Sequence, residues 1–149
     1  MSETRQLVVT IDVHVPADQA WAKLTDWPTQ GEWMLGTRVR GTTLDGRGVG
    51  GGVEGWTGVG PLGFLDTMVI TTWEPPHRCL VDHTGRVVRG TGGFEIADLG
   101  PGRCRVLWFE RIEVPSGLVG RVAWVSVKPA VRWGVVRSLR RFKRGLESL

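Results

Sequence analysis

The last part of the chain, residues 117–149, reads GLVGRVAWVSVKPAVRWGVVRSLRRFKRGLESL, and this stretch decides the fold. Apolar residues recur in it every three or four positions, which is the period of an amphipathic helix. The stripe consists of Trp124, Val127, Val131, Val135, Leu139, Phe142, Leu146 and Leu149. We therefore expect a long helix over residues 117–149. Pro129 has no backbone donor, so we expect either a kink there or a short helix followed by a longer one.

The segments before this helix have the alternating pattern of strands. In the first, residues 6–14, Leu7, Val9 and Ile11 share one face. A short helix over 17–25 and one more helical turn at 29–33 follow it. Six further strands are expected at residues 37–43, 53–58, 64–73, 77–84, 87–98 and 103–114. The loops between them are too short for crossovers, so the strands pair antiparallel.

This order of elements predicts an α+β fold: a strand, two short helices, six strands and a terminal helix. A curved antiparallel sheet of about seven strands that has one apolar helix to cover must wrap around that helix. The length of 149 residues fits one domain, 1–149, and a hydrophobic content of 41% is enough for a sizeable core.

The charge of the chain is concentrated at one end. Residues 120–149 hold eight basic residues and one acidic residue, whereas the first 119 hold eleven basic and fourteen acidic. The basic residues lie off the apolar stripe, which is typical of a solvated helix face. No aromatic side chain is interleaved with them except Phe142, which belongs to the stripe, so we expect no nucleic-acid binding. Weak contact with an anionic membrane surface is the functional alternative.

Several function classes lack the residues they need. No stretch approaches the roughly 18 apolar residues of a membrane span, and no secretory signal follows Met1, so we expect a cytoplasmic protein. Cys79, Cys104 and three histidines cannot form a zinc site of the usual spacing, so we expect no metal and no cofactor; a mixed site of His and carboxylate ligands is the alternative. The glycine-rich residues 46–52 lack a following Gly-Lys-Ser/Thr, which favours a flexible hairpin over a phosphate loop. No serine has the context of a nucleophile elbow, so a covalent hydrolase is not expected.

A set of motifs resembles the helix-grip superfamily. The motifs are Val13-His14-Val15-Pro16-Ala17 with Ala20-Trp21, then Asp26-Trp27 with Trp33, then Thr72-Trp73-Glu74-Pro75-Pro76-His77-Arg78, and finally Arg137-Ser138-Leu139-Arg140-Arg141-Phe142-Lys143. This superfamily includes START lipid-transfer domains, the birch-pollen allergen and the bacterial polyketide cyclase/dehydrase-like (SRPBCC) group. The resemblance implies a hydrophobic cavity between sheet and terminal helix. It does not imply one reaction, because members bind lipids, cyclise polyketides or carry ligands.

Two polar residues are candidates for acid–base chemistry. In residues 103–113 the face that carries Trp108 and Glu110 is the more apolar and is predicted to point inward. Burial would raise the pKa of the Glu110 carboxyl and suit it to act as a general acid or base. His83 is predicted to share an inward face with Cys79 and Val81 and could assist. The alternatives are that Glu110 is solvated or paired with an arginine at the cavity mouth, and that His83 is a satisfied residue at the rim.

Tryptophan is the most distinctive component, because the chain has eight Trp and no Tyr. Trp33, Trp56, Trp73 and Trp108 come from four elements whose inward faces can converge into flat apolar walls, which suit a planar ligand. Further ligand-binding residues are expected at Val81, Phe94, Val106, Val131 and Val135. We expect Trp21, Trp124 and Trp133 to fill the core. The alternative is that all eight tryptophans do so.

Three functional hypotheses follow from these patterns. The first is binding or carrying of a hydrophobic or aromatic small molecule, of polyketide, lipid or isoprenoid type, in a Trp-lined cavity. The second is a cofactor-independent cyclase or dehydratase that uses Glu110 and His83 as acid and base. The third is a module that acts at a membrane or ribosome surface through its basic helix. The sequence sets no oligomeric state.

Overall fold

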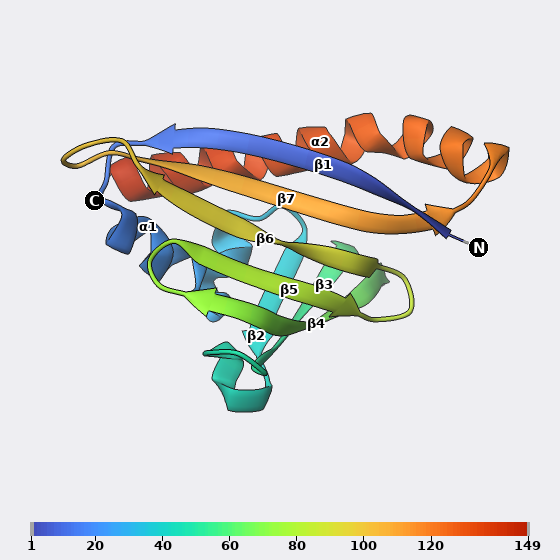
Figure 1. The fold of residues 1–149 in the computed structure, drawn as a ribbon, viewed down its shortest axis with the longest axis horizontal. Coiled ribbons are helices and arrows are strands. Elements are labelled where there is room, and N and C mark those ends of the chain that lie inside the picture. The colour runs from blue at the N-terminus through green and yellow to red at the C-terminus, as the bar shows by residue number, and fades with distance from the viewer. Residues whose placement is uncertain (1, 149) are drawn as a thin grey trace.

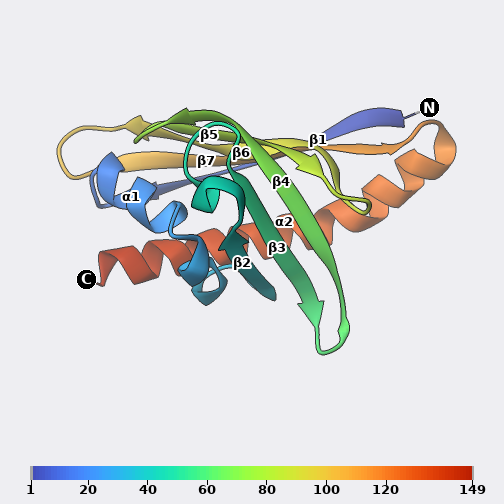
Figure 2. The same ribbon diagram turned by 90° about the horizontal axis from the view of Figure 1, so that it is seen from below.

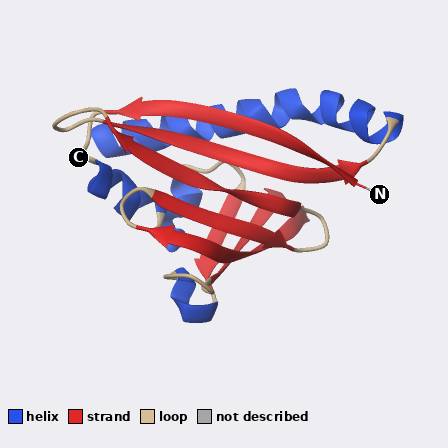
Figure 3. Ribbon diagram, in the orientation of Figure 1, coloured by secondary structure: helices blue, strands red, loops and turns tan. Residues whose placement is uncertain are grey.

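The computed structural model describes residues 2–148, which form one curved sheet and two α-helices (Figures 1 and 3). The elements in chain order are β1 (Ser2–Val13), α1 (Ala17–Leu24), the 3₁₀ helix η1 (Trp27–Glu32), β2 (Thr37–Gly41), the 3₁₀ helix η2 (Thr43–Gly46), β3 (Gly52–Val59), β4 (Leu62–Glu74), β5 (Arg78–Thr84), β6 (Arg89–Asp98), β7 (Cys104–Pro115) and α2 (Leu118–Glu147). The seven strands are all antiparallel, in the order β1-β7-β6-β5-β4-β3-β2. This confirms the predicted fold class.

The helices lie on one side of the sheet. Helix α2 packs along β1 and β7, and α1 packs on β6 and β7. Figure 2 shows that β3 and β4 run obliquely to α2 in this view. No helix among residues 2–148 is long and apolar enough to cross a membrane.

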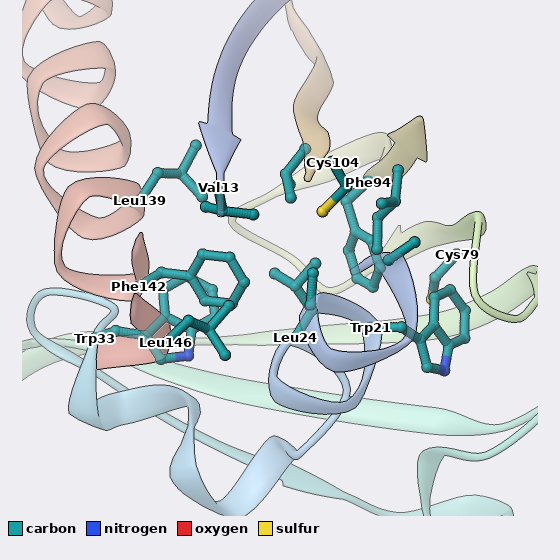
Figure 4. Packing of buried hydrophobic residues seen from close by; sticks show 14 of the residues in the cluster. Val13, Trp21, Leu24, Trp33, Cys79, Phe94, Cys104, Leu139, Phe142 and Leu146 are labelled. Carbon is teal, nitrogen blue, oxygen red and sulfur yellow. The ribbon is translucent and has the colours of Figure 1, made fainter. Parts of the chain in front are cut away.

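The core lies at the C-terminal end of α2, where that helix meets α1 and the sheet (Figure 4). Leu139, Phe142 and Leu146 of α2 are buried, and the ring of Phe142 lies 5.1 Å from that of Trp33. Trp21 of α1 packs edge-on against Phe94, with ring centroids 5.6 Å apart. The predicted burial of Trp21 is therefore confirmed.

Helix α2 differs from its expected form in two ways. It is one helix that continues through Pro129, so the expected break into two helices is wrong. Its first half is largely exposed, because the core ends near Ser138 and the helix extends beyond it. Trp133 is 62% exposed and does not fill the core as expected, and Trp124 is only partly buried. The predicted stripe position Leu149 lies outside the described residues.

The last turn of α2 is tied to the end of β1 by Glu147. The backbone N–H of His14 donates to Glu147 Oε2 at 3.0 Å, and His14 Nδ1 lies 2.9 Å from the same oxygen. Lys143 Nζ lies 3.1 Å from that carboxylate. These groups, above all the backbone N–H of His14, lower the pKa of Glu147 to about 2.

Candidate functional site

Two adjoining hollows lie on the concave side of the sheet, and α2 lines the larger of them. The larger, which we call the groove, has a volume of about 600 Å³ and runs under the first half of α2. Its helix side is formed by residues that include Val127, Val131 and Val135, and its sheet side by residues that include Leu7 and Ile112. The smaller, which we call the inner cavity, has a volume of about 110 Å³ and lies deeper, toward β3 and η1. Both hollows are mainly apolar, as expected for a small-molecule site.

A cluster of three titratable side chains lies where the groove and the inner cavity meet. Asp66 of β4, His83 of β5 and Glu110 of β7 line both hollows. His83 Nε2 lies 2.7 Å from Glu110 Oε2, and His83 Nδ1 lies 2.9 Å from Asp66 Oδ1. The His83 side chain is 3% exposed, whereas the two carboxylates are about one-fifth exposed. With both ring nitrogens held by carboxylates, His83 is placed for proton exchange rather than for metal coordination.

Strand register explains how Glu110 reaches His83. Glu110 is paired with Gly92 on β6, the strand between β7 and β5. A Cβ atom on Gly92 would collide with Glu110 Oε2 and would lie 2.9 Å from His83 Nε2. The Glu110 carboxylate therefore crosses the intervening strand through the space that a side chain at position 92 would fill.

His83 and Glu110 each retain a proton more strongly than the isolated side chain would. Burial lowers the pKa of His83, but the hydrogen bonds to Asp66 and Glu110 outweigh it and raise this pKa to about 10. Burial raises the pKa of Glu110, and the opposing effect of the adjacent His83 does not cancel that rise. At neutral pH the imidazolium N–H groups therefore donate to both carboxylates, and Glu110 can take up a further proton more readily than an exposed glutamate.

The predicted ligand-binding residues divide between the hollows and the core. Val81, Phe94 and Trp108 line the inner cavity, and Trp108, Val131 and Val135 line the groove. The Trp108 ring is stacked with Phe94 at a centroid distance of 6.2 Å and is edge-on to Trp33 at the same distance.

Four of the predicted ligand-binding residues line neither hollow: Trp33, Trp56, Trp73 and Val106. Val106 is fully buried in the core, and Trp33 is 2% exposed behind Trp108. Trp73 packs edge-on against Trp21, with ring centroids 4.9 Å apart. A bulge at Thr71 changes the alternation of β4 and so turns Trp73 toward α1.

Trp56 differs most from the expectation of an inward face. It lies on the opposite side of β3 from Gly55 and Thr57, which line the inner cavity. Its ring is covered by the Arg38 guanidinium, 5.2 Å from the ring centroid.

Sequence reasoning missed Asp66 and Gly92. Asp66 lies in a strand whose alternation places it on the face of Met68 and Ile70. Its inward position could therefore have been predicted from the two-residue period of a strand. The role of Gly92 depends on its pairing with Glu110, and no local pattern reveals that pairing.

The sequence matches the family model for polyketide cyclase / dehydrase and lipid transport over residues 4–147. The chain belongs to this family. No curated protein matches it significantly in sequence. Among solved structures, this cyclase/dehydrase-family chain is similar to the Zhui aromatase/cyclase from Streptomyces sp. R1128, with a TM-score of 0.79 and 18% identity over 97% of this chain and 94% of that one.

Two further structures show the same fold. Norcoclaurine synthase from Thalictrum flavum has a TM-score of 0.71 and 13% identity, over 99% of this family member and 97% of the synthase. The di-domain ARO/CYC BexL from the BE-7585A biosynthetic pathway has a TM-score of 0.73 and 17% identity, over 96% of this chain and 46% of BexL. At these identities the likeness establishes the helix-grip fold and does not identify a reaction.

Proposed function

We propose that the protein binds a flat, largely apolar molecule of polyketide type in the groove and catalyses proton transfer on it, as a cofactor-independent cyclase or dehydratase. The observation that supports this most directly is the position of Glu110, held by His83 at the junction of the groove and the inner cavity. Ligand binding supplies orientation, and the cluster supplies the acid and the base.

The reaction needs two proton transfers that one carboxyl group can make in turn. Ionised Glu110 removes a proton from a methylene between two carbonyl groups, and the resulting enolate attacks a second carbonyl carbon to form the new C–C bond. The alkoxide that forms takes the proton back from Glu110, which regenerates the carboxylate. In a dehydration, the Glu110 carboxylate removes the proton from the neighbouring carbon and then donates it to the leaving hydroxyl group, so that water departs and the carboxylate is regenerated.

The neighbours of Glu110 support each role. The hydrogen bond from His83 fixes the carboxylate and stabilises its charge, while burial keeps its pKa above that of an exposed glutamate. Asp66 holds the other ring nitrogen and so orients the imidazole toward Glu110. The aromatic wall at Trp108 gives a planar substrate a surface against which to lie.

Binding without turnover is the second candidate. It is favoured by the apolar character of the groove away from the cluster, which suits a carrier as well as an enzyme. The two functions share the same ligand class and differ only in whether Glu110 exchanges a proton with it.

The test compares Glu110→Gln with Glu95→Gln in assays with linear poly-β-ketone thioesters. Glu95 is a matched control, because it is a strand carboxylate whose partner is Arg78, 3.3 Å away, and it lines neither hollow. We expect Glu110→Gln to lower turnover by about 10²- to 10⁴-fold and Glu95→Gln to leave it unchanged. Native mass spectrometry of the purified protein tests the carrier directly: a retained small molecule together with no turnover by the wild-type protein would favour carrying over catalysis.

A further inference from the structure

The first half of α2 has a second apolar face, which points away from the groove. Leu118, Val122, Val125, Pro129 and Trp133 follow one another at intervals of four, three, four and four residues. At 3.6 residues per turn they form one stripe, on the side of the helix opposite Val127 and Val131. We call these five residues the outer stripe.

The outer stripe is exposed along its whole length. Leu118 is 73% exposed, Val122 55%, Val125 65% and Trp133 62%, and Pro129 is exposed as well. A contiguous exposed apolar surface of this kind marks an interaction site. Closure of the groove would not cover the stripe, because the stripe lies on the far side of the helix.

The charges around the stripe identify its partner. Every charged residue from Leu118 to Leu146 is basic, and the first acidic residue, Glu147, is bound to His14 and Lys143. By helical position, Arg121, Lys128 and Arg132 flank the stripe on one side and Arg137 flanks it on the other.

The long basic side chains also lie against tryptophan rings. Lys128 Nζ is 5.9 Å from the ring centroid of Trp124, and the Arg137 guanidinium is 5.9 Å from that of Trp133. An apolar stripe with a tryptophan, whose charged neighbours on the helix are all cations, is typical of a helix that lies in the interface of an anionic membrane.

We propose that the outer stripe of α2 docks on an anionic lipid surface, with the helix axis parallel to the membrane. The apolar residues enter the boundary between headgroups and acyl chains, and the flanking cations contact the headgroups. A second copy of the chain is a poorer partner, because two all-basic helices would repel each other across a symmetric interface. Nucleic acid would be attracted to the cations but would leave the exposed valines and Leu118 in water.

The test is co-sedimentation with vesicles of phosphatidylcholine alone or of phosphatidylcholine mixed with phosphatidylglycerol. We expect binding only to the mixed vesicles, weakened by added salt. Val125→Glu should weaken it by about ten-fold or more. Val127→Glu is the matched control, because Val127 is also about half exposed (51%) but faces the groove, and this variant should bind vesicles like the wild type. Arg121→Gln should weaken binding about five-fold.

A fluorescent label gives an independent measurement of which face inserts. Both native cysteines are buried, so a cysteine introduced at Val125 or at Val127 can be labelled selectively with an environment-sensitive dye. We expect a blue shift on mixed vesicles for Val125→Cys and none for Val127→Cys. The proposal is overturned if the wild type does not bind mixed vesicles, if both glutamate variants lose binding equally, or if sedimentation without lipid shows a dimer that Val125→Glu dissociates. None of these results depends on turnover in the groove.

Discussion

Glu110 and His83 are in contact although a whole strand separates the two strands that carry them. Their carboxylate and imidazole atoms are 2.7 Å apart because Gly92 of the intervening β6 has no side chain between them. Together with Asp66, the pair spans the four adjacent strands β4 to β7, and it exists only once the sheet has formed in its correct register.

Substitution of Gly92 by alanine should separate this pair. Gly92 does not have a positive φ, so the backbone accepts alanine, and the three atoms nearest to an added Cβ all belong to the Glu110 and His83 side chains. We expect a loss of stability of about 1–3 kcal/mol and a fall in the pKa of His83, measured by denaturation and by NMR titration. In a Glu110→Ala background the same substitution should have little effect, and an equal loss there would contradict our account of Gly92.

The stability of the protein should fall as the pH rises above neutrality. His83 has an ordinary pKa of 6.5 when unfolded and about 10 when folded, so its contribution is complete below pH 6.5 and is lost as the pH rises through 10. The raised pKa of Glu110 acts in the same direction at lower pH. Urea denaturation between pH 6.5 and 9 measures the slope. A His83→Gln variant should have a flatter profile, and an unchanged slope in that variant would assign the effect to other groups.

Glu147 should have the opposite pH dependence. Its pKa is lowered from 4.5 to about 2 on folding, so its contribution is present above pH 4.5 and is lost as the pH falls through 2. Glu147→Gln should cost about 1 kcal/mol at pH 7. The difference in unfolding free energy between variant and wild type should shrink toward pH 2, and a constant difference would show that the charge of Glu147 is not what ties α2 to β1.

Two tryptophans should respond differently to a ligand. Trp108 lines both hollows, whereas Trp56 lies on the other face of the sheet under Arg38. With a hydroxyanthraquinone as the probe, Trp108→Phe should weaken binding about five-fold and Trp56→Phe should not change it, as measured by titration calorimetry. Equal effects would mean that the probe does not bind in the groove or the inner cavity.

The sequence predicts the fold well because periodicity is a local property. The alternation of Cys104, Val106 and Trp108 defines the inward face of β7, and Glu110 continues it. Reliance on periodicity also explains the error at Trp56. Its neighbours Gly55 and Thr57 are barely apolar, so the pattern assigned the large indole to the inward face. In the structure the indole lies on the outer face. The bulge at Thr71 and the pairing of Gly92 with Glu110 depend on neighbouring strands, and one strand's sequence does not encode them.

The division of α2 into a buried end and an exposed end separates two kinds of evolutionary constraint. Changes at Leu139, Phe142 or Leu146 act on whether the chain folds at all, because these residues join the helix to the core. Changes at Val127 or Val131 reshape the groove without touching that junction. A few substitutions in the first half of one helix can therefore change which molecules the groove accepts, without altering the residues that hold the helix in place.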